Sequence, residues 1–463
     1  MASFDLTKGP VGPQLTRMTI PFFLGISSMI MASMIETIYI GVLGADELAA
    51  YSFTFPLMMA LTSISMGVGV GASSLIARAE GEGDRDQVRR IATHTMILTF
   101  GLTLMVCAAV YSYLGGIFSL MGAEGEVLRL VVEFSQIWVL GLLFFTFPMV
   151  GSNVLRSLGI AKTPGYVMAL TSLLQLVVSP ILIFGLLGFP ALGFTGSAYA
   201  FIVIGVVRVF SMGLLVINED ILNWQNLLGG FAKSTRDIMQ IALPAMLTSL
   251  IGPVSMAVTI ALLAAHGSVV VAAFGIVSRV EMLVTMVLGA LSSSVAPFAG
   301  QNWGARKTQR IYEGLKLADR FSLLWGLCCF ILLAPFGAQI VGLINDEPML
   351  SETANWYLII VPISYGLLGV GQNSSSLFIA LGKPIPPTIL AAFRMVVVYV
   401  PLALLFDFYW GFIGIFIALA VANVLMGIGA FIWARMMLRR EIKLFGLDPV
   451  GLTPVASAHR SDG

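Results

Sequence analysis

The chain has 463 residues, of which 58 % are apolar and 11 % are charged, and its net charge is +1. Soluble globular domains carry roughly a quarter charged residues, so this composition excludes an ordinary water-soluble protein. The balanced charge gives no indication of a nucleic-acid partner. The three cysteines, Cys107, Cys328 and Cys329, lie in apolar segments without the spacing of a metal site.

Apolar runs longer than about 20 residues, the length that a helix needs to cross a bilayer, recur along the whole chain. They predict an all-α polytopic membrane protein with twelve transmembrane helices. In chain order the predicted spans are 17–43, 48–77, 92–115, 130–156, 163–187, 194–217, 238–264, 269–298, 316–345, 353–380, 386–406 and 412–436. We expect a cytoplasmic linker at 218–237 between two bundles, 1–217 and 238–446, and a disordered cytoplasmic tail at 447–463.

The two halves repeat one another with an offset of 223 residues. Pro21 is matched by Pro244, and the pair Leu158-Gly159 is matched by Leu381-Gly382. An even number of spans in each half predicts two six-helix bundles related by a pseudo-twofold axis along the membrane normal. Internal repeats of this kind are typical of secondary transporters that work by alternating access.

Basic residues gather in alternate loops, and such loops usually face the cytoplasm. The basic loops contain Arg85, Arg89 and Arg90 after the second span and Arg306, Lys307 and Arg310 after the eighth. The opposite loops are mainly acidic, as at Glu124 and Glu126. We therefore expect both termini in the cytoplasm and the protein in the plasma membrane of a bacterium or an archaeon.

Several short patterns occur in a recognisable order. They include Glu36-Thr37 followed by Gly41 and Gly44, the run 156–159 (Arg-Ser-Leu-Gly) with Pro164, and the stretch 297–305 that closes the eighth span. With these patterns the chain resembles the multidrug and toxic compound extrusion (MATE) family, within the multidrug/oligosaccharidyl-lipid/polysaccharide flippase superfamily. The resemblance implies export of lipophilic, often cationic, compounds in exchange for protons or sodium ions.

The chain also departs from the family pattern. Many members carry an Asn-x-x-x-Asp-Pro run in the fifth span, where this chain has Gln175 to Ser179-Pro180 and no carboxylate. Some branches carry acids in spans seven and ten, at positions that correspond to Gly252 and Val370. Mechanisms that depend on those acids do not carry over.

Glu36 is the leading candidate for proton coupling, because an ionisable residue inside a span is costly and usually functional. It also matches the acid that the family carries in the first span. Polar residues that could complete a first-bundle site are Ser33, Thr37, Asn153, Gln175 and Ser179. The alternative is a glutamate held by hydrogen bonds for packing alone.

The second half offers different candidates, namely Arg279, Glu281, Gln372, Asn373 and Arg394. Arg279 is expected to point away from Glu281, whereas Arg394 could pair with it, either as a structural ion pair or in coupling. Arg208 is expected to extend its charge to the membrane interface. Methionines such as Met29 and Met58 could form an adaptable substrate surface, although membrane spans are often rich in methionine.

The leading hypothesis is a proton-coupled antiporter that exports lipophilic organic cations. The alternatives are a sodium-coupled exporter of the same family and a flippase for lipid-linked precursors, which would need basic residues such as Arg208, Arg279 and Arg394 in a central cavity. Three scattered histidines argue against a metal centre and so against a membrane-embedded enzyme, and the lack of a phosphate-binding loop leaves ATP-driven pumping unsupported. We expect no cofactor or metal, an amphiphilic organic substrate and the lipid bilayer as partners, and a monomer.

Overall fold

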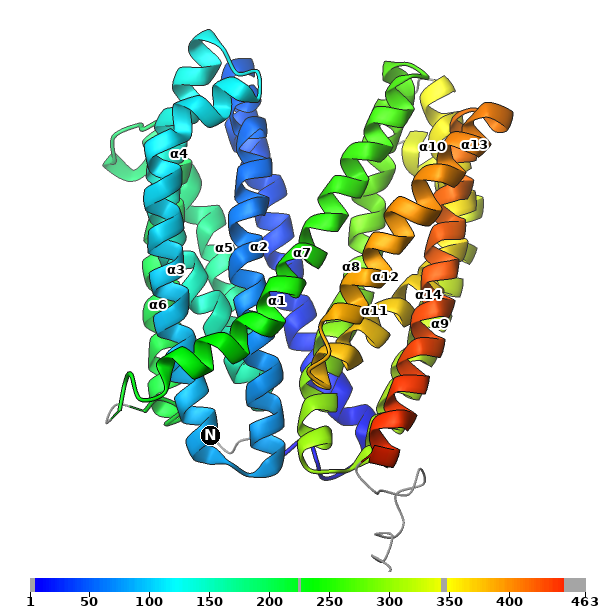
Figure 1. Ribbon diagram of the computed structural model, residues 1–463. Helices are drawn as coiled ribbons and strands as arrows, with labels where there is room; N and C mark the ends of the chain where they lie inside the picture. Colours follow the sequence, from blue (N-terminus) through cyan, green and yellow to red (C-terminus); the bar gives the residue numbers. More distant parts are fainter. Residues whose placement is uncertain (1–4, 224–225, 343–347, 445–463) are drawn as a thin grey trace, which may run out of the picture. The chain divides into compact units, whose positions relative to one another are not determined.

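A computed structural model describes residues 5–223, 226–342 and 348–444. Within these ranges the chain forms helices and no strands (Figure 1). Twelve helical segments are long and apolar enough to cross a membrane, which confirms the predicted number of spans. The expected tail at 447–463 lies outside the described residues.

The described part of the first half contains six spanning helices, several of which extend beyond the predicted apolar ranges. They are α1 (Val11–Leu43), α2 (Ala45–Glu82), α3 (Arg85–Leu120), α4 (Gly125–Ser157), α5 (Lys162–Phe184) and α6 (Phe194–Asn218), with a short 3-10 turn, η1 (Leu186–Gly188), before α6. The Asp84 side chain accepts a hydrogen bond from the backbone N–H of Gln87 (2.9 Å) and so caps α3. Because capped and charged first turns lengthen a helix beyond its apolar part, hydropathy placed the start of this span seven residues too late.

The second half contains the other six spans, two of which are interrupted. Its helices are α7 (Phe231–Ala264), α8 (Ser268–Gly304), α9 (Thr308–Gly342), α10 (Pro348–Ile360), α11 (Tyr365–Ala380), α12 (Ile385–Ala392), α13 (Val400–Trp410) and α14 (Phe412–Leu444). A 3-10 turn, η2 (Val361–Ser364), joins α10 to α11, and a π-helical turn, η3 (Phe393–Tyr399), joins α12 to α13. Such turns inside a span are often found at functional positions.

The backbone repeats the duplication seen in the sequence. Gly159 ends α4 with φ +82°, and the matching Gly382 ends α11 with φ +72°. The residue after each glycine donates its N–H to the carbonyl five residues before it, over 3.0 Å in the first half and 2.8 Å in the second. Glycine is the residue that takes up this left-handed conformation without strain, which explains the matched Leu-Gly pairs.

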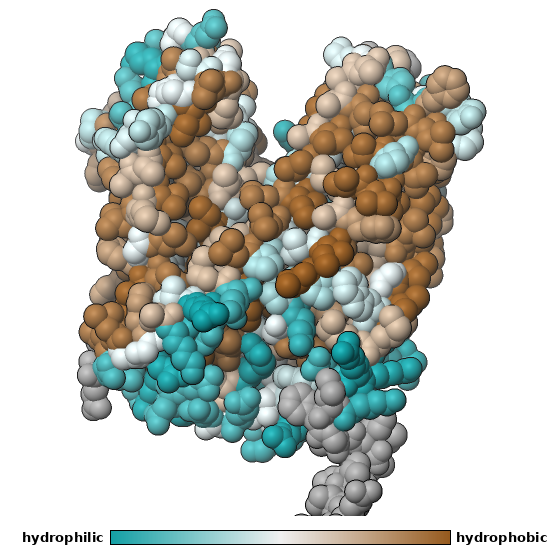
Figure 2. Space-filling view, in the orientation of Figure 1, coloured by the Kyte–Doolittle hydropathy of each residue, from teal (hydrophilic) through white to brown (hydrophobic). Residues whose placement is uncertain are grey.

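Large apolar side chains cover the outside of the helices. Leu170 (68 % exposed), Phe210 (69 %) and Phe408 (83 %) are examples from three different spans. Figure 2 shows hydrophobic residues along the length of the helices and hydrophilic residues gathered toward their ends. An apolar surface of this extent suits lipid rather than water, so the protein is a multi-pass membrane protein.

The described helices divide into two compact units that differ slightly from the two sequence halves. One unit contains Arg17–Ala79 and Asp84–Leu250, and the other contains Asp5–Thr16, Glu80–Gly83 and the chain from Ile251 onward. The first helix of each half therefore begins in the unit that holds most of the other half. Hydropathy could not predict this exchange, because it reports which residues are apolar and not which helix they pack against.

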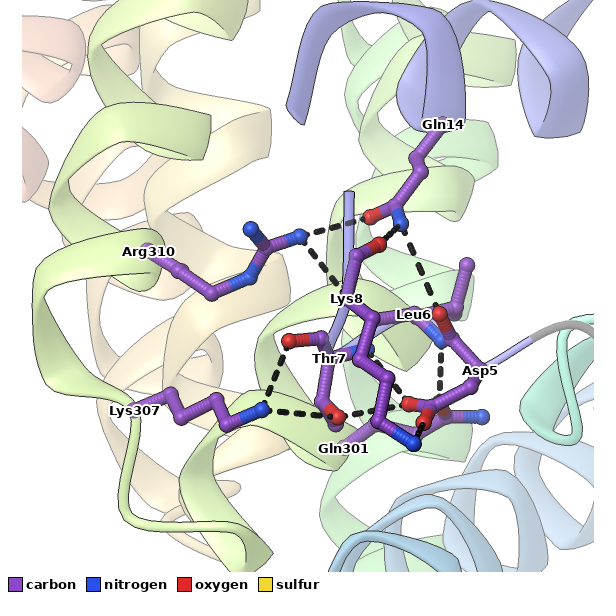
Figure 3. Close-up of polar contacts among 8 residues, drawn as sticks. All are labelled: Asp5, Leu6, Thr7, Lys8, Gln14, Gln301, Lys307 and Arg310. Atoms are coloured by element: carbon purple, nitrogen blue, oxygen red, sulfur yellow. Dashed lines mark hydrogen bonds and ion pairs between the residues drawn. The ribbon is translucent and has the colours of Figure 1, made fainter. Parts of the chain in front are cut away.

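The N-terminal segment 5–16 is held in its unit by polar contacts with the end of α8, the turn that follows it and the first turn of α9 (Figure 3). Arg310 donates hydrogen bonds to the carbonyl of Leu6 (3.2 Å) and to Gln14 Oε1 (2.9 Å). Lys307 Nζ donates to the carbonyl of Thr7 (2.8 Å). The Leu6 side chain is fully buried, so the segment is anchored by both apolar and polar contacts.

Asp5 opens this segment. Burial alone would raise its pKa, but hydrogen bonds from Thr7 and Lys8 lower the pKa of Asp5 from 3.8 to about 2. Because the folded pKa lies below the unfolded one, the stabilising contribution of this carboxylate is complete above about pH 4 and is lost as the pH falls toward 2.

Candidate functional site

Glu36 lies inside the first unit, where three side chains donate hydrogen bonds to its carboxyl group. The residue is 7 % exposed. Its Oε2 accepts a hydrogen bond from Gln175 Nε2 (3.0 Å). Its Oε1 accepts hydrogen bonds from Ser197 Oγ (2.6 Å) and Ser179 Oγ (3.3 Å). A buried carboxylate needs such partners to offset its loss of water.

The helices that carry these donors place them by simple periodicity. Thr171, Gln175 and Ser179 are spaced four residues apart and form a polar stripe along α5. Ser197 lies in the first turn of α6, and Arg208 follows it by 11 residues, about three full turns later on the same face. The polar faces of α5 and α6 thus meet the face of α1 that carries Glu36.

Arg208 continues the hydrogen-bonded row beyond Gln175. Its Nη2 donates to Gln175 Oε1 (3.2 Å), and its Nε donates to Thr171 Oγ1 (3.1 Å). The residue is 8 % exposed, so the expectation that Arg208 extends to the membrane interface was wrong. The polar stripe of α5 holds its charge inside the bundle instead.

A cavity of about 320 Å³ adjoins the carboxyl group. Its aromatic and methionine lining consists of Tyr51, Phe55, Phe134, Trp138, Phe145, Phe201, Met29, Met58 and Met59. Glu36, Gln175, Ser197 and Arg208 also lie in its wall. A mainly apolar space with a few converging polar groups has the character of a small-molecule site.

Three of the five polar residues predicted to accompany Glu36 lie near it. Gln175 and Ser179 bond its carboxyl group, and Ser33 lines the cavity. The hydroxyl of Thr37 donates instead to the Ser33 carbonyl within α1 (2.9 Å). The Asn153 amide donates to the Met149 carbonyl (3.2 Å) and accepts a hydrogen bond from Arg156 instead of bonding Glu36.

Ser197 and Thr171 were missed in the sequence. Serine and threonine are common in membrane helices, where their hydroxyls can bond to the preceding turn. They therefore attract little notice beside an ionisable residue. The separation of 11 residues between Ser197 and Arg208 was the available signal, since it places both on one face of the sixth span.

The second-half candidates fall into separate groups. Glu281 of α8 is hydrogen-bonded to Tyr357 of α10 and interacts electrostatically with Arg394. Arg279 is exposed. Thr259, the counterpart of Glu36 in the repeat, is hydrogen-bonded to Tyr399 (2.6 Å), so a pair of hydroxyls stands where the first half has its carboxyl group.

Asn373 belongs to a different cluster, which includes Asp319 and Ser322. Its Nδ2 donates to Asp319 Oδ1 (3.2 Å) and to Ser322 Oγ (3.2 Å). Asp319 in turn forms an ion pair with Arg435 (2.7 Å). Asp319 was not predicted, because it lies beside Arg320 near the charged start of α9. Gln372 is half-buried and takes no part in these hydrogen bonds among the described residues.

The described residues form twelve spanning helices in two repeated halves, with a buried carboxyl group beside a cavity, which is the architecture of a membrane transporter. The model of the MatE family matches residues 21–181 and 244–405. The chain therefore belongs to the MATE family, whose members are transporters and not enzymes.

Individual relatives agree over nearly the full length. The chain is 33 % identical to the FAD transporter of Shewanella oneidensis, over 93 % of this chain and 96 % of that protein. It is 27 % identical to the probable multidrug resistance protein YoeA of Bacillus subtilis, over 87 % and 89 %. The structure of the Vibrio cholerae MATE transporter VcmN in the bent form superimposes with a TM-score of 0.89 at 28 % identity, over 93 % and 98 %. The structural neighbour confirms the predicted all-α fold of twelve helices in two bundles.

Proposed function

We propose that the protein is a proton-coupled exporter in which Glu36 carries the coupling proton and the adjoining cavity receives an organic cargo. The observation that carries the proposal is the position of Glu36, which lies in the cavity wall and is hydrogen-bonded to Gln175 and Ser197. Because a hydroxyl can donate or accept, the same surroundings can serve the charged and the neutral carboxyl group.

Exchange of the proton for the cargo follows if the two compete for the same site beside Glu36. A positively charged cargo beside Glu36 favours the ionised carboxylate, whereas a bound proton removes the attraction for that cargo. The proton and the cargo then occupy the site in turn, as antiport by alternating access requires. One proton returned for each monovalent cation makes the exchange electroneutral. Sodium is the competing coupling ion.

Two kinds of compound are candidates for the cargo. The first is an amphiphilic organic cation, in line with the multidrug relatives and with the aromatic and methionine lining of the cavity. The second is FAD, which the name of the Shewanella relative supports; its negative charge suits Arg208, and for this cargo the exchange with the proton does not follow from attraction to Glu36. A flippase is less well supported, since Arg208 and Arg394 lie in different units with partners of their own.

The setting of the protein is part of the proposal. The basic loops favour cytoplasmic termini and insertion in the plasma membrane of a bacterium or an archaeon. Each chain carries both halves of the repeat, which favours a monomer.

The test measures proton release from acid-loaded everted vesicles on addition of ethidium or FAD, with and without sodium. The vesicles contain the parent, Glu36→Gln or the control Glu133→Gln, whose acid is half exposed beside Arg129. We expect cargo-evoked release in the parent and in the control, independent of sodium, and none in Glu36→Gln. Proton release that persists in Glu36→Gln would overturn the role of Glu36. A requirement for sodium would show that sodium, and not the proton, is the coupling ion.

A further inference from the structure

Arg208 fixes the direction of the hydrogen bonds that reach Glu36. A guanidinium group can donate hydrogen bonds but cannot accept them. The atom of the Gln175 amide that faces Arg208 Nη2 must therefore be the oxygen, Oε1, at 3.2 Å. The amide nitrogen then faces Glu36 Oε2, at 3.0 Å, and can only donate to it.

The orientation of this amide is held at two points. Arg208 also donates through Nε to Thr171, one turn before Gln175 on α5. A reversed amide would turn its N–H groups toward the guanidinium of Arg208. The amide and the guanidinium would then both lack an acceptor, at a cost of about 1–3 kcal/mol for each buried group. Oε2 of Glu36 is consequently an acceptor whether the carboxyl group is charged or neutral.

The other oxygen has partners that can reverse their roles. Ser197 Oγ lies 2.6 Å from Oε1 and Ser179 Oγ lies 3.3 Å from it. A hydroxyl group donates to a carboxylate but can accept from a carboxylic acid. Of the two serines, Ser197 has the shorter bond and is the one that lines the cavity.

We infer that the coupling proton is carried on Oε1 of Glu36 and that Ser197 is the positioning residue that accepts its hydrogen bond. This inference rests on the proposed function and adds which oxygen takes the proton and what holds it there. On loading, a proton from water in the cavity forms the O–H bond at Oε1. The Ser197 hydroxyl then turns its own hydrogen toward a carbonyl of the preceding turn, a bond that serines in helices commonly make.

The other titratable groups near Glu36, Tyr51 and Arg208, do not change the assignment of the proton to Oε1. Tyr51, which also lines the cavity, is hydrogen-bonded to Ser33, and Arg208 contacts the carboxyl group only through Gln175. The release step reverses the loading step, since the proton leaves Oε1 for water and Ser197 again donates to the carboxylate. No other covalent bond is made or broken.

The experiment compares Ser197→Ala with Ser197→Thr, which keeps the hydroxyl, and with the control Ser152→Ala, a buried serine of α4 outside the cavity lining. Infrared difference spectra of the full-length protein, recorded between alkaline and acidic pH, report the carbonyl band of protonated Glu36, which is identified by its loss in Glu36→Gln. Proton-driven transport of ethidium and FAD is measured on the same variants.

We expect Ser197→Ala to shift the carbonyl band and to slow proton-driven transport about tenfold or more, the scale of one lost hydrogen bond to a charged group. Ser197→Thr and Ser152→Ala should behave like the parent. An unshifted band and undiminished transport in Ser197→Ala would overturn the inference while leaving the proposed function intact. The proposed function fails separately, if Glu36→Gln still couples transport to protons.

Discussion

Glu36 and Arg208 are joined through one side chain, the amide of Gln175, which donates to the carboxyl group and accepts from the guanidinium. The buried acid and the buried base thus belong to one row of hydrogen bonds with a fixed direction. This row links α1, α5 and α6, and any movement of α1 that displaces Glu36 must rearrange it.

Replacing Arg208 tests whether this row supports transport. Arg208→Met should lower proton-driven transport at least about tenfold and destabilise the protein by about 3 kcal/mol, because it leaves a buried acid and two polar side chains without their partner. The lysine of Arg208→Lys keeps a positive charge and can donate hydrogen bonds. This variant should therefore recover part of the transport and part of the stability. Vesicle transport and thermal unfolding in detergent measure the two effects, and parental transport in Arg208→Met would contradict this role.

A close contact between α1 and α5 provides a second test. A Cβ atom on Gly165 would lie 2.5 Å from the carbonyl oxygen of Pro21, so Gly165→Ala must push the two helices apart. Overpacking of this kind costs about 1–3 kcal/mol, and it should also reduce transport because it displaces the helix that carries Glu36.

The matched control is Gly101→Ala in α3, where a Cβ atom would have no neighbour within 4 Å. Thermal unfolding and vesicle transport of the two variants should differ, with only Gly165→Ala impaired. Equal behaviour would show that the contact with Pro21 is not required.

A substitution in the turn between α8 and α9 is expected to stabilise the protein. Arg306 has φ +58°, and its counterpart in the first half, 223 residues earlier, is Gly83 with φ +79°. A left-handed conformation costs an ordinary L-residue about 1–2 kcal/mol, so Arg306→Gly should raise the stability by about 1 kcal/mol and Gly83→Ala should lower it by a similar amount. Thermal unfolding in detergent measures both, and a destabilised Arg306→Gly would mean that the arginine side chain makes a compensating contact.

Asp319 and Arg435 are expected to stabilise the second unit without taking part in coupling. Asp319→Ala leaves the partly buried guanidinium without its ion pair and Asn373 without an acceptor, a loss of about 3 kcal/mol. The double variant Asp319→Ala/Arg435→Ala should lose less than the sum of the two single changes. The number of protons exchanged per cargo, measured on the folded fraction, should equal that of the parent. A changed ratio would instead assign this pair to the coupling mechanism.

Part of this architecture could be read from the sequence. Twelve spans follow from apolar runs, and the duplication follows from pairs such as Gly159 and Gly382, because both halves need glycine at the same left-handed turn. Glu36, Gln175 and Ser179 could be grouped because polar residues in lipid must turn toward the interior of a bundle.

The remaining features depend on packing that no periodicity reports. The burial of Arg208 needs the stripe that begins at Thr171, and Asn153 is occupied by Arg156 on its own helix. The docking of residues 5–16 with the unit that holds the second half depends on contacts between residues about 300 positions apart, such as Leu6 with Gln301. Helix partners across such distances are invisible to hydropathy.

The role of Glu36 as the carrier of the coupling proton is tested most directly by accumulation of cargo in proteoliposomes under an imposed pH gradient, for the parent and for Glu36→Gln. Ethidium and FAD are each supplied at equal concentration on both sides, and exchange of labelled cargo without a gradient is measured in parallel. We expect the parent to accumulate its cargo and Glu36→Gln to exchange it without accumulating it, because the binding cavity remains while the proton carrier is gone. Accumulation by Glu36→Gln equal to that of the parent would show that Glu36 does not carry the coupling proton.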